Sequence, residues 1–140
     1  MRADGRLFQP GQLRTREVRA GQHIKPGAQS IPAFLDRFAQ CYGTVRDGEL
    51  SVLAVTAAHH RPAWIHPFED SNGRVARLHS HLLLCAMGLT NGIGSPLRRL
   101  ARNQTEYYAR LAKADQTRRG DPDGGGNFTE SGLIEFIDFF

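Results

Sequence analysis

The sequence lacks the features that mark secreted proteins, membrane-spanning proteins and proteins that bind metals through cysteine pairs. It has two cysteines, Cys41 and Cys85, and their spacing fits neither a metal site nor a redox pair. Two free thiols in a reducing compartment are therefore expected. No run approaches about 18 consecutive apolar residues, and the N-terminus has no apolar signal region. We expect a cytoplasmic protein without a membrane span, and export by a route that uses no cleaved signal remains open.

Length and charge limit the class of protein further. With 140 residues, of which 40% are hydrophobic, the chain is predicted to form one domain over residues 1–140. The abrupt start before the first motif is also compatible with a piece of a longer protein. A formal net charge of +4 suits phosphate ligands or acidic partners. Nucleic acid is not expected as a partner, because most such charges lie on solvated faces.

Hydrophobic periodicity predicts an all-α domain with one small β-hairpin. The hairpin is expected over about residues 13–25, with its turn at Ala20-Gly21. The helix at 97–119 reads as one helix or two, and the helix at 74–87 is so apolar that we expect it to be the buried central helix. Helices are predicted over residues 30–42, 47–64, 74–87, 97–119 and 129–140.

Local signals set several helix ends. Ser30 is the expected N-cap of the first helix, and Gly43 ends it. Pro62 is expected to bend or break the last turn of the second helix. Either Thr129 or Ser131 is expected to cap the last helix.

A polar loop at residues 66–73 leads into the predicted helix at 74–87, and its residues suit phosphate binding. A helix N-terminus has unpaired N–H groups and the positive end of the dipole, so Ser71-Asn72-Gly73 precedes a natural anion site. Gly73 permits close approach of the backbone to an anion. Arg74 and Arg77 are three residues apart, share a helix face and could both hold a polyphosphate.

The same loop carries a candidate base and a candidate metal ligand. His66 has an ordinary pKa near neutrality and could accept the proton of an attacking hydroxyl. Asp70 is an oxygen ligand suited to a Mg²⁺ ion that bridges phosphates. Phe68 is expected to point into the core and fix the loop. A capped helix start with surface charges and a core histidine is the alternative. This alternative accounts for each residue taken singly. It does not readily account for a base, a carboxylate and two arginines that all lie near one helix N-terminus.

Residues 66–77 resemble the signature of the Fic family, His-x-Phe-x-Asp/Glu-Gly-Asn-Gly-Arg-x-x-Arg. The match holds at every fixed position except Ser71, where the signature usually has glycine. The resemblance extends from about residue 11 to residue 115. Gly11 to Pro26 is similar to the family's flap segment, and Glu106 to Asp115 is similar to its tyrosine-bearing helix.

The resemblance implies a protein adenylyltransferase with a Fic/Doc-type helical bundle, using Mg²⁺ and ATP. His66 would be the general base, Asp70 the magnesium ligand, and Arg74 and Arg77 the residues that hold the β- and γ-phosphates. The anion hole would consist of the backbone at Ser71, Asn72 and Gly73 together with the Asn72 side chain. Of Tyr107 and Tyr108, one would pack in the core and the other would line the nucleotide site, with Tyr108 favoured for the nucleotide.

The resemblance also implies partners. An unknown target protein would add a strand to the flap, whose residues are Arg16, Glu17, Val18, Arg19, Ala20 and Gly21. An ordinary exposed hairpin is the equal alternative. Many Fic proteins are restrained by a helix with the pattern Ser/Thr-x-x-x-Glu-Gly/Asn. Ser131 to Glu135 match its first five positions, but Phe136 follows, so any inhibitory segment or partner would lie outside this chain.

Three other functions stay open from the sequence. A Doc-like protein kinase would bind ATP reversed and transfer the γ-phosphate, although Gly73 favours AMP transfer. A hydrolase that removes AMP, or a nucleotide-binding module with little turnover because of Ser71, would use the same residues. A zinc site at the histidines is not expected, since His79 and His81 face apart on a helix.

Overall fold

The computed structural model describes residues 11–20, 23–43, 49–90, 96–123 and 128–140. This part of the chain is all-α, as predicted, and none of its helices is long and apolar enough to cross a membrane. Two 3₁₀ turns, η1 (Ala28–Ser30) and η2 (Asp121–Asp123), accompany the helices. The helices are α1 (Ile31–Tyr42), α2 (Glu49–Ile65), α3 (Asn72–Ala86), α4 (Pro96–Arg102), α5 (Gln104–Ala114) and α6 (Glu130–Phe139).

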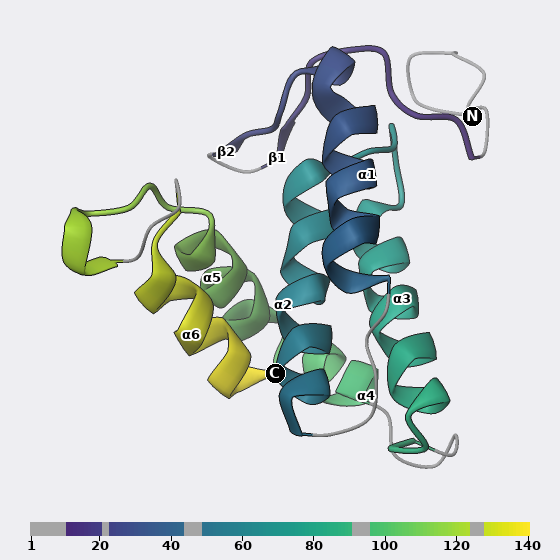
Figure 1. The fold of residues 1–140 in the computed structure, drawn as a ribbon, viewed down its shortest axis with the longest axis vertical. Coiled ribbons are helices and arrows are strands. Elements are labelled where there is room, and N and C mark those ends of the chain that lie inside the picture. Colours follow the sequence, from purple (N-terminus) through teal and green to yellow (C-terminus); the bar gives the residue numbers. More distant parts are fainter. Residues whose placement is uncertain (1–10, 21–22, 44–48, 91–95, 124–127) are drawn as a thin grey trace.

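Two short strands precede the helices. β1 (Arg19–Ala20) and β2 (His23–Ile24) pair antiparallel, with Arg19 opposite Ile24 and Ala20 opposite His23. They lie within the range 13–25 and at the upper end of the molecule in Figure 1. Gly21, at the predicted turn, is outside the described residues. The use of this segment as a docking flap stays a prediction.

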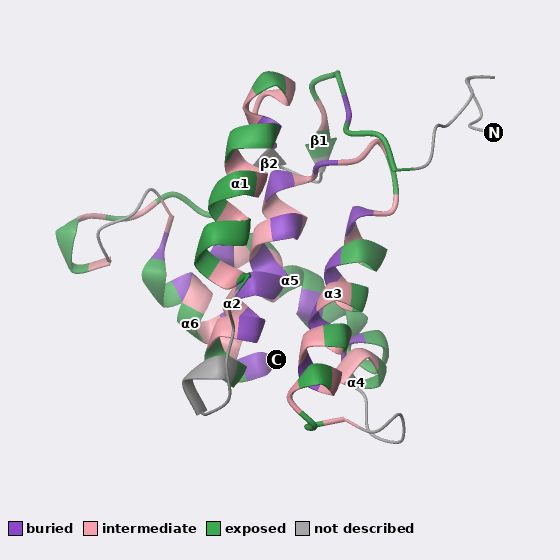
Figure 2. Ribbon diagram, turned by 45° about the vertical axis from the view of Figure 1, so that its right-hand side comes forward, coloured by how far each residue is buried: buried purple, intermediate pink, exposed green. Residues whose placement is uncertain are grey.

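Helix α2 occupies the centre of the bundle. It packs against α1, α3 and α6, and its side chains Val55, Ala58 and Ile65 are buried. Figure 2 shows the buried positions concentrated along α2, while the outer face of α1 is exposed. Helices α1, α3 and α6 therefore pack around α2.

The prediction that residues 74–87 form the buried central helix is wrong. Helix α3 lies at the side of the bundle, and its Leu78 and Leu82 are 56% and 58% exposed. A helix packed on one side buries only a stripe at about four-residue spacing. In α3 this stripe is Ala76, Ser80 and Leu84.

A second group of apolar side chains joins the last three helices. Leu100 of α4, Tyr107 and Ala114 of α5, and Phe136 and Phe139 of α6 pack into one core cluster. The predicted helix at 97–119 is thus two helices, and the second ends at residue 114.

The helix ends differ from the predictions in detail. Ser30 makes no capping hydrogen bond, because the turn η1 runs directly into α1. Thr129 does cap α6, since its side-chain oxygen accepts the N–H of Gly132 at 3.3 Å. Pro62 is accommodated inside α2, which continues to Ile65.

Candidate active site

The loop from residue 66 to residue 71 connects α2 to α3 and is held in a strained shape. His66 and Ser71 have φ values of 52° and 72°, in the left-handed region. This conformation costs about 1–2 kcal/mol for a residue with a Cβ atom. The Asn72 side chain helps to hold the loop in this conformation. Its Oδ1 accepts the N–H of Phe68 at 2.8 Å, and its Nδ2 donates to the Phe68 carbonyl at 2.7 Å.

These two bonds change the role predicted for Asn72. The side chain was expected to form part of an anion hole, but both of its polar atoms are used on Phe68, and the residue is buried. The Asn72 side chain therefore shapes the loop. The backbone N–H of Asn72 stays at the helix N-terminus.

His66 is half-buried and has the properties of a neutral base. Its Nδ1 faces the carbonyl of Ala63 at 3.4 Å, an arrangement that places the proton on Nδ1 and leaves the lone pair on Nε2. Burial lowers the pKa of His66, and the nearby charges of Lys25 and Arg14 lower it further, against the opposing effect of the Ala63 carbonyl and Asp115. The imidazole is therefore neutral at neutral pH.

The N-terminus of α3 has no side-chain cap. Val75 donates its N–H to the Ser71 carbonyl at 2.9 Å, and Ser71 makes no capping bond with its hydroxyl. The N–H groups of residues 72–74 consequently have no partner within the helix. Together with the positive end of the helix dipole they can bind an anion such as a phosphate.

The two predicted phosphate-binding arginines lie in different surroundings. Arg74 is exposed, and its Nη2 contacts the Ser71 hydroxyl and also Asp70 Oδ2 at 3.3 Å. Arg77 instead runs back along the helix, since a Cβ atom at Gly73 would lie 3.3 Å from Arg77 Nη1. A Cβ atom at position 73 would require this guanidinium to shift by a few tenths of an ångström.

Asp70 fits the requirement of a magnesium ion bound together with phosphates. Its carboxylate is exposed, and Mg²⁺ commonly takes one or two protein carboxylates and completes its coordination with water and phosphate oxygens. No group of three or more His, Cys, Asp or Glu side chains suited to a metal occurs among the described residues. Nucleotide phosphates would therefore have to supply further ligands.

The two tyrosines separate into a buried and an exposed residue. Tyr107 is 2% exposed, and its hydroxyl lies 2.9 Å from Nε2 of His59, so the prediction that it lines the nucleotide site needs correction. Tyr108 is 52% exposed. Its ring lies 5.1 Å from the Tyr107 ring between centroids, and its role beside a nucleotide base stays a prediction. Burial raises the pKa of Tyr107 to about 12, and the charge of Arg77 opposes this shift.

Arg14 is a residue of the site that sequence reasoning missed. It is buried, and its Nε donates to the His66 carbonyl at 2.7 Å, while its two terminal nitrogens donate to the carbonyls of Arg16, Pro26 and Ile65. Arg14 thus ties the N-terminal segment to the start of the loop. No local sequence pattern marks this arginine, because the acceptors at His66, Pro26 and Ile65 are backbone carbonyls distant along the chain.

The predicted flap residues are largely exposed. Arg16, Glu17 and Arg19 are exposed and Val18 is half-buried. The segment that follows is fixed to the bundle by Lys25, whose Nζ lies 3.2 Å from Asp115 Oδ2 at the end of α5.

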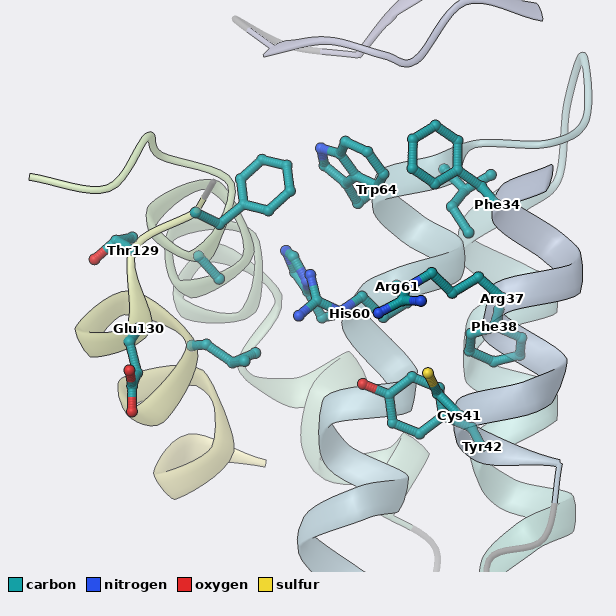
Figure 3. A pocket seen from close by; sticks show the side chains of 14 residues that line it. Phe34, Arg37, Phe38, Cys41, Tyr42, His60, Arg61, Trp64, Thr129 and Glu130 are labelled. Carbon is teal, nitrogen blue, oxygen red and sulfur yellow. The ribbon is translucent and has the colours of Figure 1, made fainter. Parts of the chain in front are cut away.

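A cavity of about 500 Å³ lies elsewhere, between α1, α2 and the start of α6 (Figure 3). Its walls include the aromatic residues Phe34, Phe38, Trp64 and Phe128. None of the predicted site residues lines it. The candidate active site, made by the loop at residues 66–71 and the start of α3, thus lies apart from this cavity.

Comparison with known proteins assigns the family. The model of the Fic/DOC family matches residues 2–84, which include the whole loop and most of α3. The chain belongs to the Fic/DOC family. It is 30% identical over 109 residues to the protein adenylyltransferase Fic of Drosophila mojavensis, covering 77% of this chain and 21% of that protein. The enzyme of the same name from Drosophila melanogaster is 30% identical over 107 residues, covering 76% and 21%.

Solved Fic structures share the fold. A Fic domain-containing signalling protein from Bacteroides thetaiotaomicron superposes with a TM-score of 0.68 at 23% identity, covering 94% of this chain and 50% of that chain. A Fic family protein from Desulfovibrio desulfuricans gives a TM-score of 0.62 at 24% identity, covering 96% and 41%. The chain spans about a fifth of the length of the curated Fic relatives named above.

Proposed function

We propose that this chain is a protein adenylyltransferase, which transfers AMP from Mg-ATP to a hydroxyl group of a target protein. The observation that carries the proposal is the loop between α2 and α3. It joins a neutral, half-buried imidazole to an uncapped helix N-terminus through a backbone fixed by Asn72. A base and an anion-binding backbone on one rigid segment suit transfer from a nucleoside triphosphate. The name shared by the curated relatives supports the same reaction.

The proposed reaction begins at the target hydroxyl. Its oxygen attacks the α-phosphorus of ATP and forms a new oxygen–phosphorus bond, while the bond to the oxygen that bridges to the β-phosphate breaks. Pyrophosphate leaves, and the hydroxyl proton passes to Nε2 of His66. The lowered pKa of His66 keeps this nitrogen unprotonated before the reaction.

The remaining residues bind and orient the triphosphate. The N–H groups at the start of α3 hold phosphate oxygens, and Arg74 and Arg77 hold the β- and γ-phosphates. Asp70 would hold magnesium, which supplies positive charge against the phosphates when bound. Tyr108 offers an exposed ring for the adenine. The target segment would pair with the strand region around residues 16–20.

An isotope experiment tests the proposal. The protein is incubated with Mg²⁺, a cell lysate and ATP labelled at either the α- or the γ-phosphate. We expect protein-bound label from α-labelled ATP alone, lost in His66→Ala and retained in His81→Ala, a control histidine on the following helix.

The other outcomes distinguish the alternatives. Label from the γ-phosphate alone would overturn the proposal in favour of a kinase. If neither the unmodified protein nor His66→Ala produces label with any nucleoside triphosphate tried, the result would favour a nucleotide-binding module. Release of AMP from a lysate already carrying the modification would favour a hydrolase. Label from a nucleotide other than ATP would show that Ser71 alters nucleotide preference.

A further inference from the structure

The cavity between α1, α2 and the start of α6 has the size of a small-molecule site. Its volume is about 500 Å³, and pockets that bind small molecules commonly measure about 300–1,000 Å³. Such pockets combine apolar and aromatic walls with a few polar groups that orient the ligand. Both kinds of side chain line this cavity.

Part of the wall is a row of three aromatic rings from three segments of the chain. Trp64 of α2 lies between Phe34 of α1 and Phe128, which precedes α6. The ring centroids of Phe34 and Trp64 are 5.1 Å apart at an interplanar angle of 86°, and those of Trp64 and Phe128 are 4.8 Å apart at 71°. These edge-to-face contacts favour fixed ring orientations. All three rings are only half-buried, so they keep apolar surface for the ring of a ligand.

Two arginines from neighbouring helices line the same cavity. Arg37 belongs to α1 and Arg61 to α2, and Figure 3 shows their side chains below Trp64 and Phe34, in the space between α1 and α6. Within the part of the chain that the structure describes, neither guanidinium takes part in an ion pair. Both can therefore donate to an anion, and the planar guanidinium matches the geometry of a carboxylate.

The charge of the lining favours a ligand with a single negative charge. Apart from His60, the charged residues of the lining are the two arginines and Glu130, which leaves a net charge of +1. Glu130 is exposed, and Figure 3 shows its carboxylate beside α6, away from the arginines. A carboxylate matches this net charge, whereas a phosphate monoester carries about −1.5 to −2 at neutral pH.

His60 contributes a buried polar atom to the wall. The residue is 1% exposed, and its Nε2 lies 2.8 Å from Asp115 Oδ1. Because a carboxylate accepts hydrogen bonds, this contact places a proton on Nε2. Nδ1 has no hydrogen-bond partner among the described residues. Buried nitrogens usually have one, so this wall suits a ligand that also carries a hydroxyl or amine donor.

We propose that this cavity is a binding site for a small aromatic carboxylate. The ring of the ligand packs against Phe34, Trp64 and Phe128, and its carboxylate accepts hydrogen bonds from Arg37 and Arg61. The aromatic row and the two arginines thus recognise opposite ends of one molecule. The site goes beyond the proposed AMP transfer, because it requires neither ATP nor a target protein.

The fluorescence of Trp64 tests the proposal directly, since Trp64 is the only tryptophan of the chain and lines the cavity. The protein is titrated, without nucleotide, with para-hydroxyphenylacetate and with its uncharged amide, para-hydroxyphenylacetamide. We expect a saturable change in Trp64 emission with the carboxylate. The affinity for the amide should be about tenfold weaker, because the amide has no charge to pair with the arginines. Calorimetry provides a second measurement of both affinities.

Substitutions in the wall locate the ligand. Arg37→Gln and Arg61→Gln should each weaken binding of the carboxylate about tenfold and leave binding of the amide unchanged. Arg98→Gln is the matched control, because Arg98 is an exposed arginine of α4 that does not line the cavity. Its effect should stay within about twofold, since a distant exposed charge is screened. Leu133→Phe enlarges a side chain of the wall and should weaken binding of both probes, with the helical circular dichroism retained.

Several results would overturn the proposal. These are equal affinities for the carboxylate and the amide, equal losses in Arg37→Gln and Arg98→Gln, and unchanged binding in Leu133→Phe. Absence of carboxylate binding at millimolar concentrations, by both fluorescence and calorimetry, would overturn it as well. None of these results bears on AMP transfer, because the residues assigned to that reaction do not line the cavity. Failure of the isotope experiment would equally leave this site intact.

Discussion

At the scale of single residues, Ser71 is the position where the chain departs from its family. The backbone there is left-handed, a conformation that glycine adopts without strain and serine does not. The hydroxyl of Ser71 gains a contact with Arg74 on an exposed surface. Such a contact is worth less than the strain, so the serine weakens the loop on balance.

Ser71→Gly should therefore stabilise the protein. Relief of about 1–2 kcal/mol of backbone strain outweighs the cost of about 0.5–1 kcal/mol for the greater freedom of glycine in the unfolded chain. We expect a net gain of roughly 0.5–1 kcal/mol in denaturant unfolding. Ser71→Ala is the control, because it keeps the Cβ atom and loses only the hydroxyl. A gain of the same size in Ser71→Ala would show that backbone strain is not the cause.

At the scale of elements, the site depends on how the N-terminal segment is attached to the loop. Leu13 forms an isolated antiparallel bridge with Phe68, and Arg14 donates its N–H to the Pro67 carbonyl at 2.8 Å. The buried Arg14 side chain then holds the carbonyl of His66. The segment before the hairpin is thus hydrogen-bonded to the loop at residues 66–71.

Arg14→Ala should disrupt this unit. Several buried carbonyls would lose a charged donor, and we expect a loss of about 2–4 kcal/mol in the free energy of unfolding. Transfer activity should fall as well, because the His66 backbone loses its support.

Arg16→Ala is the matched control for this variant. Its side chain is exposed two residues further along, and surface substitutions of this kind usually change stability by less than about 0.5 kcal/mol. Equal unfolding free energies for Arg14→Ala and Arg16→Ala, measured by urea titration, would refute the role of Arg14.

At the scale of the whole molecule, buried histidines link stability to pH. His59 lies where α2, α3, α5 and α6 meet, and its ring stacks against Phe136 with centroids 5.8 Å apart. Its charged form is excluded from the folded protein, which lowers the pKa from 6.5 to about 3. The unfolded chain binds this proton below pH 6.5 and the folded protein does not.

Stability should therefore be constant above pH 6.5 and fall as the pH decreases from 6.5 towards 3. The contribution of His59 has a slope of up to about 1.4 kcal/mol per pH unit within this window. Urea titrations at a series of pH values measure it. His59→Gln should be less stable at pH 8 yet show a shallower slope, since the contribution of His59 is lost while those of other groups with lowered pKa values, such as His66 and His79, remain. An unchanged slope in His59→Gln would contradict the assignment.

The sequence by itself determined the fold class, most helix positions and the loop that carries His66, Asp70 and the candidate anion site. These depend on local information, namely the spacing of apolar residues and the order of residue types in one short motif. The turn after α1 at Gly43 and the cap at Thr129 are local in the same sense.

Only the tertiary structure decided which helix is central and what each buried polar side chain contacts. The middle of helix α3 carries a run of leucines in the sequence, yet Leu78 and Leu82 are exposed because α2 occupies the centre. Arg14, His59 and Tyr107 find their partners 21 to 52 residues away along the chain, as in the pairs of His59 with Ser80 and Arg14 with His66. Periodicity reports on neighbours one or two helical turns apart. It cannot report contacts that form only when whole helices pack.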